Sequence, residues 1–163
     1  MIPAGESSAS REMRKHPSTS GERASVKESM KLKIALPKIP DIELVALEGL
    51  ERLARYMGIR EDKIGEARIL VTEAIINGLE HSGQKHPTVR VEFSMTKKEL
   101  VILVRDYGKG FEPGAVEEPD IKKKVGSKNK RGWGLKVMKS MSDDFQIESG
   151  KRGTKITIKK LLS

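Results

Sequence analysis

Two hairpin patterns constrain the fold of this chain more than any other feature. Residues 89–94 alternate apolar and polar side chains, and the apolar run 100–104 follows them after a short turn. Residues 144–149 and 154–161 form a second pair around a turn at 150–153 that contains two glycines. Alternation with a period of two predicts strands, and connections this short join neighbouring strands in antiparallel order. Because the apolar face of such a sheet must be covered, we expect helices layered on it rather than a doubly wound parallel fold.

Three other segments repeat apolar residues at steps of three and four, which is the period of an amphipathic helix. The first, at about 44–57, follows the alternating segment 31–36, and Asp41 is positioned to cap it. The second runs from about 61 to 81, and the third from about 132 to 142. The order is therefore strand, helix, helix, strand, strand, loop, helix, strand, strand. We expect an α+β two-layer sandwich in which a mixed, mostly antiparallel sheet carries three helices on one face.

Two segments fall outside this pattern. Residues 1–30 are rich in Ser, Gly, Lys and Glu and have no apolar period, which predicts a flexible, disordered basic tail. Residues 112–130 contain Pro and Gly but no period, and a loop of this length in a compact domain predicts a mobile functional segment. The chain has 163 residues, enough for one domain with its own core, which we place at 31–163.

Composition excludes several classes of protein. The chain has no cysteine, which excludes a disulfide framework, a thiolate metal site and a thiol nucleophile, and its three histidines are too few for a histidine-rich metal site. It has no apolar run of membrane-spanning length and no apolar leader segment, so we expect a cytoplasmic protein without a membrane partner. The net charge is +9, with the excess in the tail and between residues 120 and 131. Because the few aromatic residues are not interleaved with these cations, we expect a loop beside a polyphosphate rather than a nucleic-acid-binding surface.

The second predicted helix carries Glu73, Asn77 and His81 at steps of four. Residues at this spacing form one slowly drifting row along a helix, and this row lies away from the apolar stripe. A carboxylate and an amide one turn apart can hold a hydrated Mg²⁺ ion and a polarised water or hydroxyl, which suits phosphate chemistry. The same row is also typical of a solvated helix face, so it does not define a site by itself.

The segment Asp106-x-Gly108-x-Gly110 directly follows the apolar strand 100–104. An aspartate at a strand end can accept a hydrogen bond from an exocyclic amine. Glycines without a Cβ atom allow the backbone to turn sharply and to approach a flat ligand. A simple turn explains the pattern equally well.

A glycine-rich turn, Gly132-x-Gly134, opens the third predicted helix. Unpaired backbone N–H groups at a helix N-terminus bind anions, and glycines let phosphate oxygens reach them. Six basic side chains precede this turn: Lys122, Lys123, Lys124, Lys128, Lys130 and Arg131. A charge run is usually only solvated, but this one leads directly into an anion-binding turn.

Together these motifs resemble those of one superfamily, the GHKL (Bergerat-fold) ATP-binding proteins. In chain order the matching positions are Glu73, Asn77 and His81, then Asp106, Gly108, Gly110 and Phe111, then Gly132, Gly134 and Leu135, then Gly153 and Thr154. Within the superfamily, the chain is most similar to the small anti-sigma regulatory factors and serine/threonine kinases of partner-switching modules. The resemblance covers about residues 31–162 and implies the Bergerat ATP-binding fold, with ATP and Mg²⁺ as cofactors.

The resemblance implies a role for each matching residue. Asn77 corresponds to the family's magnesium ligand, and Glu73 to the residue proposed to activate the attacking hydroxyl or water. Asp106 corresponds to the aspartate that binds the adenine amine, with Gly108 and Gly110 shaping the base pocket. His81 is frequent at its position in this branch, and we interpret it as orienting rather than catalytic.

The remaining cofactor-binding positions belong to the phosphate end of the site and to one strand. They are Lys130, Arg131, Gly132, Trp133, Gly134, Leu135 and Thr154. Gly132 and Gly134 correspond to the glycines whose backbone cradles the phosphates, and Thr154 to a threonine that helps to fix adenine. Residues 112–130 correspond to the ATP lid, in which either Lys130 or Arg131 would reach the γ-phosphate.

The function implied by the resemblance is that of an ATP-dependent serine/threonine kinase with a second, sequestering role. Its substrate would be a STAS-type anti-anti-sigma protein, and the sequestered partner a sigma factor or another signalling protein. The resemblance leaves homodimer formation open, which in this branch is often through a sheet face or edge. The alternative is a non-catalytic regulatory module in which ATP only sets partner affinity. The chain departs from the branch at Gly78, where alanine is usual and where glycine costs about 1 kcal/mol of helix propensity.

Overall fold

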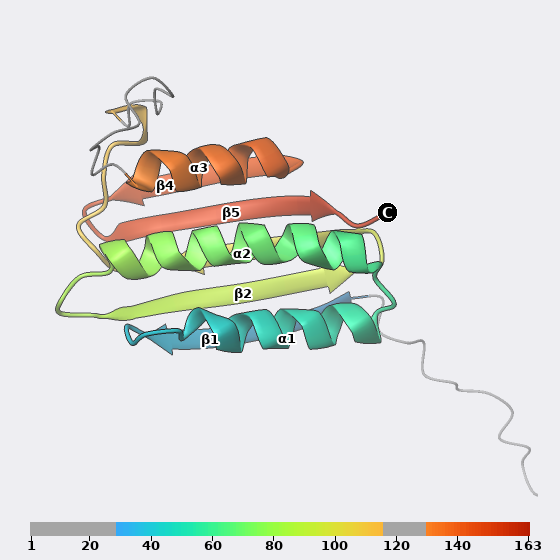
Figure 1. Cartoon of the computed structure of the whole chain (residues 1–163). Helices are drawn as coiled ribbons and strands as arrows, with labels where there is room; N and C mark the ends of the chain where they lie inside the picture. The colour runs from blue at the N-terminus through green and yellow to red at the C-terminus, as the bar shows by residue number, and fades with distance from the viewer. Residues whose placement is uncertain (1–28, 116–129) are drawn as a thin grey trace, which may run out of the picture.

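The computed structural model describes residues 29–115 and 130–163. In chain order the elements are β1 (Ser29–Pro37), α1 (Glu43–Tyr56), α2 (Glu61–His81), β2 (Thr88–Thr96), β3 (Glu99–Arg105), the short 3₁₀ turn η1 (Pro113–Ala115), α3 (Lys130–Met141), β4 (Asp144–Gly150) and β5 (Gly153–Leu161). All three helices lie on one face of a single sheet, which gives the expected two-layer α+β sandwich (Figure 1).

The sheet has the order β1-β2-β3-β5-β4, and every pairing among the described strands is antiparallel. The sequence predicted a mixed, mostly antiparallel sheet. Strands β3 and β4, which are joined through a helix, do run in the same direction. They do not pair, since β5 lies between them and is antiparallel to both. The helical hairpin α1–α2 likewise returns the chain to the end of the sheet where β1 finished, so β2 pairs with β1 in antiparallel order.

The core lies between the sheet and the helices. Phe93, Ile102 and Ile158 are register neighbours on β2, β3 and β5, and none of them is exposed to solvent. Helix α2 lies over the middle of the sheet, nearly aligned with the strands, and its Val71 and Ala74 are also completely buried. Burial of a large apolar side chain contributes roughly 1.5–3 kcal/mol, so the apolar stripe of α2 fixes this helix on the sheet.

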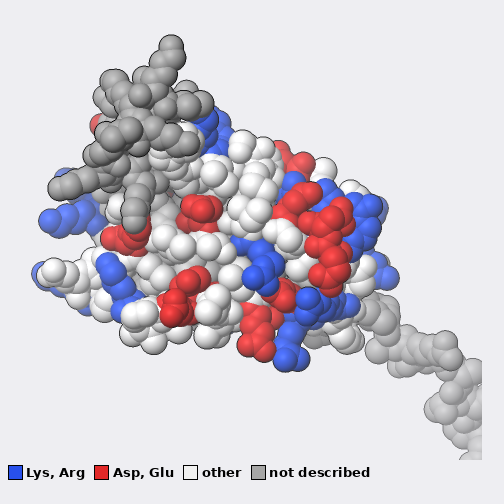
Figure 2. Space-filling model, in the orientation of Figure 1, with Lys and Arg blue, Asp and Glu red and all other residues white. Residues whose placement is uncertain are grey.

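Charged side chains of both signs crowd the outer surface where α1 ends and α2 begins (Figure 2). Arg55 of α1 lies 3.3 Å from Glu51 and 3.1 Å from Glu61 of α2, and Arg68 of α2 also pairs with Glu51. Exposed pairs of this kind contribute at most about 1 kcal/mol each, so they orient the helical hairpin rather than hold it on the sheet. None of the described helices is both long enough and apolar enough to cross a lipid bilayer.

Both predicted hairpins are confirmed, and the ends of the elements show where local signals were misread. Asp41 does not cap α1: the N-cap is Ile42, and Asp41 adopts a φ of 58° in the preceding turn. Aspartate tolerates this left-handed conformation, so its short polar side chain serves the turn rather than the helix. Strand β1 begins at Ser29 rather than Lys31, and α3 begins at Lys130 rather than near Gly132.

The two segments expected to be mobile fall almost entirely outside the described residues. These are residues 1–28 of the predicted tail and residues 116–129 of the predicted lid.

Candidate functional site

The amide of Asn77 is the first sign of a ligand site. Asn77 lies on α2 and is only 6% exposed, yet its Nδ2 atom has no hydrogen-bond partner; no other buried side-chain nitrogen or oxygen among the described residues is left unpaired. An unsatisfied buried polar group costs about 1–3 kcal/mol. A bound molecule that accepts a hydrogen bond from the Asn77 Nδ2 atom would remove this cost.

Glu73 lies one helical turn before Asn77 and faces α3. A Cβ atom placed on Gly134 would come within 3.0 Å of the Glu73 Oε2 atom, which is tighter than an ordinary van der Waals contact. Gly134 therefore leaves room for the Glu73 carboxylate beside the first turns of α3. The structure thus brings together two motifs that lie 61 residues apart in the sequence.

Asp106 is held by the backbone at the end of β3. The residue is 2% exposed, and its Oδ1 atom accepts hydrogen bonds from the Gly108 N–H at 2.9 Å and the Thr154 N–H at 3.3 Å. Its own N–H donates to the Thr154 carbonyl at 3.0 Å. Both side-chain bonds reach the same carboxylate oxygen, which leaves Oδ2 able to accept a hydrogen bond from a ligand amine.

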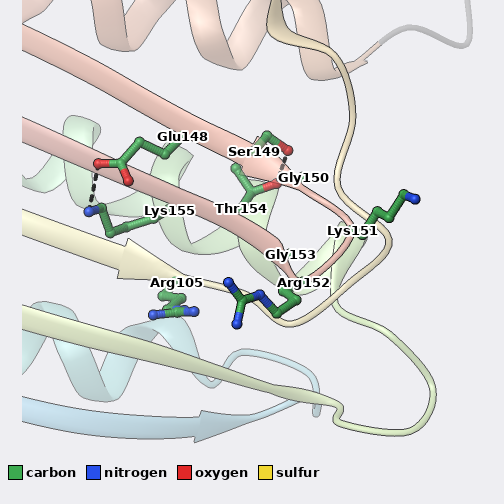
Figure 3. Close-up of a pocket in the computed structure, with 9 residues that line it drawn as sticks. All are labelled: Arg105, Glu148, Ser149, Gly150, Lys151, Arg152, Gly153, Thr154 and Lys155. Carbon is green, nitrogen blue, oxygen red and sulfur yellow. Dashed lines mark hydrogen bonds and ion pairs between the residues drawn. The ribbon is translucent and has the colours of Figure 1, made fainter.

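Thr154 is buried next to Asp106 and joins a chain of hydroxyl contacts. Its Oγ1 atom lies 2.8 Å from the Ser149 Oγ atom across the β4–β5 hairpin (Figure 3). The Ser149 Oγ atom also accepts the Phe111 N–H at 2.8 Å. Sequence analysis overlooked Ser149, although the predicted hairpin register already places it opposite Thr154.

The glycines around Asp106 are required by close contacts between backbone segments. A Cβ atom on Gly108 would overlap the His81 carbonyl oxygen at the end of α2. A Cβ atom on Gly110, whose φ is 68°, would overlap the Gly150 carbonyl oxygen. Gly153, with a φ of 105°, packs in the same way against the carbonyl of Asp106. These glycines therefore have a structural reason of their own, since they let the ends of α2 and β3 and the β4–β5 hairpin meet. The base-binding role of Asp-x-Gly-x-Gly stays a prediction.

The glycine-rich motif that the sequence predicts to bind phosphate lies inside the first turns of α3 rather than ahead of the helix. Because α3 begins at Lys130, the N–H groups of its first four residues have no partner within the helix, and that of Gly132 is among them. Gly132 is buried, whereas Trp133 is partly exposed and has the Lys136 ammonium 5.8 Å from its ring centroid. Leu135 packs against the core.

The side chains of Lys130 and Arg131 lie outside the described residues, as do the lysines of the segment 120–128. Which of Lys130 and Arg131 would reach a phosphate therefore stays a prediction. At the other end of the row on α2, His81 is half-buried, and its carbonyl oxygen faces Gly108.

Comparison with known proteins identifies the family. Residues 40–160 match the model of the histidine kinase-like ATPase domain. Similar proteins include an anti-sigma F factor of Clostridium kluyveri, which is 29% identical over 63% of this chain and 73% of the relative. An anti-sigma F factor of Clostridium acetobutylicum is 32% identical over 61% and 71% of the two chains. A serine-protein kinase RsbW of Oceanobacillus iheyensis is 25% identical over 72% and 78%.

The fold also has a counterpart among solved structures. A crystal structure of RsbU and RsbW domains from Mycobacterium tuberculosis aligns with a TM-score of 0.59 at 17% identity, over 81% of this chain and 32% of that one. At this identity the likeness concerns the fold, and it agrees with the family match obtained from the sequence. The chain therefore belongs to the histidine kinase-like ATPase family, among relatives named anti-sigma factors and serine-protein kinases.

Proposed function

We propose that this protein is an ATP-dependent serine/threonine kinase of a partner-switching module in the cytoplasm. Its substrate is a Ser or Thr hydroxyl on a STAS-type antagonist protein, and it also sequesters a sigma factor or another signalling partner. The observation that carries the proposal is the unpartnered buried amide of Asn77, one turn from a carboxylate that faces the start of α3. The names of the relatives agree with this class of activity.

The nucleotide would lie between Asp106 and the first turn of α3. The free Oδ2 atom of Asp106 accepts the exocyclic amine of adenine, and the Thr154 hydroxyl supports the base from β5. The Gly132 N–H and its neighbours at the helix start point their partial positive charge at the phosphates. Residues 112–130 serve as the lid, and Lys130 or Arg131 adds positive charge near the γ-phosphate.

Asn77 is suited to a hydrated magnesium ion that is shared with the phosphates. Its amide oxygen is the kind of ligand that Mg²⁺ prefers, and its unpartnered nitrogen can donate to a phosphate or water oxygen. When bound, the ion neutralises phosphate charge and lowers the barrier to phosphoryl transfer.

Glu73 acts on the acceptor hydroxyl. As the hydroxyl oxygen of the partner forms its bond to the γ-phosphorus, the bond from phosphorus to the β,γ-bridging oxygen breaks, and ADP leaves. The hydroxyl proton passes to the Glu73 carboxylate, which the space at Gly134 allows to reach toward the phosphate end of the site.

Glu73→Gln tests this role because glutamine keeps the size and shape of the side chain but cannot take the proton. General-base catalysis contributes about 10²–10⁴-fold, so we expect radiolabel transfer from ATP to a co-encoded STAS protein to fall by at least about 10²-fold, with ATP affinity nearly unchanged. The matched control is Glu80→Gln, an exposed glutamate further along the same helix, which keeps full transfer.

The same assay distinguishes the kinase from the regulatory module. Tight ATP binding by the wild-type chain with no transfer to the STAS protein contradicts the kinase assignment. If Glu73→Gln also leaves partner regulation intact while Asn77→Ala abolishes it, the protein is a non-catalytic ATP-dependent binding module.

A further inference from the structure

Ser149 connects the proposed base-binding residue Thr154 to the backbone at Phe111. The hydroxyl groups of Ser149 and Thr154 lie 2.8 Å apart across the β4–β5 hairpin (Figure 3). Thr154 alternates along β5 with the buried Ile156, and Ser149 alternates along β4 with Ile147, which packs against the core. Both hydroxyl groups therefore lie on the side of the sheet that the helices cover, which is the side of the proposed nucleotide site.

A backbone N–H group at one end gives these contacts a direction. The Phe111 N–H group, which can only donate, bonds to the Ser149 Oγ atom at 2.8 Å. Among the described residues, the Thr154 Oγ1 atom is the only acceptor within reach of the Ser149 hydroxyl proton. Donation from Phe111 also polarises the Ser149 O–H bond, which makes this hydroxyl group a better donor. Ser149 therefore donates to Thr154.

This direction leaves the hydroxyl proton of Thr154 for a ligand. Thr154 is only 3% exposed, and no described residue other than Ser149 forms a hydrogen bond with its hydroxyl group. A buried donor without an acceptor is costly. Thr154 thus resembles the Asn77 amide, because a bound molecule would supply the missing acceptor in each case.

The neighbouring Asp106 supplies the opposite kind of group. Asp106 and Thr154 are joined by two hydrogen bonds, and the Asp106 Oδ2 atom is left to accept one more. The two side chains therefore offer one acceptor and one donor. Adenine has the complementary groups, because its exocyclic amine donates and the ring nitrogens on either side of the amine only accept.

We propose that Ser149 is a positioning residue for base recognition, which holds the Thr154 hydroxyl group as a donor to a ring nitrogen of adenine, directly or through one water molecule. This inference rests on the proposed function, because it concerns the same nucleotide site. Ser149 acts through Thr154 rather than on the nucleotide itself. Without the Ser149 hydroxyl group, the Thr154 hydroxyl group can rotate, and its proton is no longer directed to the base.

The test compares ATP with the two deaza analogues in which a CH group replaces one of the ring nitrogens on either side of the amine. Calorimetric titration with Mg²⁺ present gives the affinity of the full chain for each nucleotide. We expect the wild-type chain to bind one analogue about three- to tenfold more weakly than ATP, because that analogue loses one hydrogen bond. In Ser149→Ala, we expect the ATP affinity to fall by a similar factor and the ratio of ATP to analogue affinity to approach unity.

Two further variants separate positioning from a structural role. Ser149→Thr keeps the hydroxyl group and retains both the ATP affinity and the affinity ratio. Ser140→Ala removes an exposed hydroxyl group that donates to the Val137 carbonyl within α3, and it leaves both values unchanged. If Ser149→Ala does not fold, Ser149→Cys takes its place, because a thiol is of similar size but is a weak donor.

The outcomes also distinguish this inference from the proposed function. If the wild-type chain binds none of the three nucleotides, both are overturned. If it binds ATP tightly but binds both analogues equally well, only the role of Ser149 is overturned. An equal loss of affinity for all three nucleotides in Ser149→Ala, which leaves the ratio unchanged, would mean that Ser149 only supports the fold and likewise overturns its positioning role.

Discussion

In the proposed site, Asp106 binds the protein through one carboxylate oxygen and has the other left for a ligand. Two backbone N–H groups, from Gly108 and Thr154, fix Oδ1 and so orient the whole carboxylate. Because the carboxylate is fixed in this orientation, its Oδ2 atom favours a ligand that offers a hydrogen-bond donor. This arrangement gives the side chain a chemical preference for an amine over a carbonyl group.

Asp106→Asn is therefore expected to change which base is bound. The asparagine oxygen can still accept both N–H groups, while its nitrogen replaces the free carboxylate oxygen and presents a donor. A hydrogen bond to a charged group is worth about 1.5–3 kcal/mol, so we expect ATP affinity to fall by at least about tenfold. The affinity for ITP, which has a carbonyl in place of the amine, is expected to rise relative to ATP.

Titration of both nucleotides by calorimetry measures this change in preference. Asp144→Asn is the matched control, because it removes the same charge from an exposed position on β4. An unchanged ratio of ATP to ITP affinity in the Asp106 variant would show that this carboxylate does not contact the base.

At the scale of elements, α2 links the core to the site. Gly78, directly after Asn77, lies where the helix approaches β2 and β3 most closely among its glycines: a Cβ atom there would be 3.2 Å from Val89 and 3.3 Å from Val104. Gly65 lies in the same helix with nothing within 4 Å of the corresponding position. Close packing against β2 and β3 therefore accounts for glycine at position 78, where the branch usually has alanine. Gly65 has no such contact.

The two glycines are expected to respond to alanine in opposite directions. Alanine gains about 1 kcal/mol of helix propensity at either position, but overpacking a core typically costs about 1–3 kcal/mol. We expect Gly65→Ala to raise the free energy of unfolding by about 0.5–1 kcal/mol and Gly78→Ala to lower it by about 1 kcal/mol. Urea denaturation measures both values. A stabilised Gly78→Ala variant would mean that the valines move aside without cost.

Elements were predictable from the sequence wherever a short-range signal determines them. The hairpins of β2–β3 and β4–β5 followed from alternation and turn residues, and the extent of α2 followed from its apolar period. The insertion of β5 between β3 and β4 did not, because strand order depends on long-range pairing that no local pattern encodes. Asp41 was misassigned because the same residue type suits both a helix cap and a left-handed turn.

The candidate site was predictable as a set of motifs but not as a geometry. Glu73, Asn77 and Asp106 were found from residue type and spacing, whereas Ser149 and the packing role of Gly153 became visible only once β4 and β5 were placed beside Asp106. The reason is physical: backbone contacts between distant segments leave no periodic trace in the sequence.

At the scale of the whole molecule, one lysine ties three elements together. Lys160 of β5 lies 2.7 Å from the Glu66 Oε2 atom of α2 and donates to the Met141 carbonyl at the end of α3, at 2.9 Å. The hydrogen bond from Lys160, followed by that from Lys63, holds the pKa of Glu66 below its ordinary value of 4.5, against the opposing effect of burial.

This lowered pKa predicts a pH-dependent contribution to stability. Because the folded state favours the ionised carboxylate, the contribution is fully present above the unfolded pKa and is lost as the pH falls through the lower folded pKa. We expect the thermal midpoint of Glu66→Gln to lie below that of the wild-type chain at about pH 7, and the gap to close toward about pH 3. Glu80→Gln, which has no cation partner among the described residues, is the control. A gap that stays constant over this range would rule out the ion pair as its cause.

The position of β5 between β3 and β4 also determines when the sheet can be completed during synthesis. Strands β1, β2 and β3 can pair as soon as they leave the ribosome, but the second edge of β3 finds its neighbour only after residues 153–161 have emerged. Until then β3 presents an unpaired edge, to which the strands of other nascent chains can add. Of the described strands, β5 is thus the last to be translated, and it completes the sheet and with it the surroundings of Asp106 and Thr154.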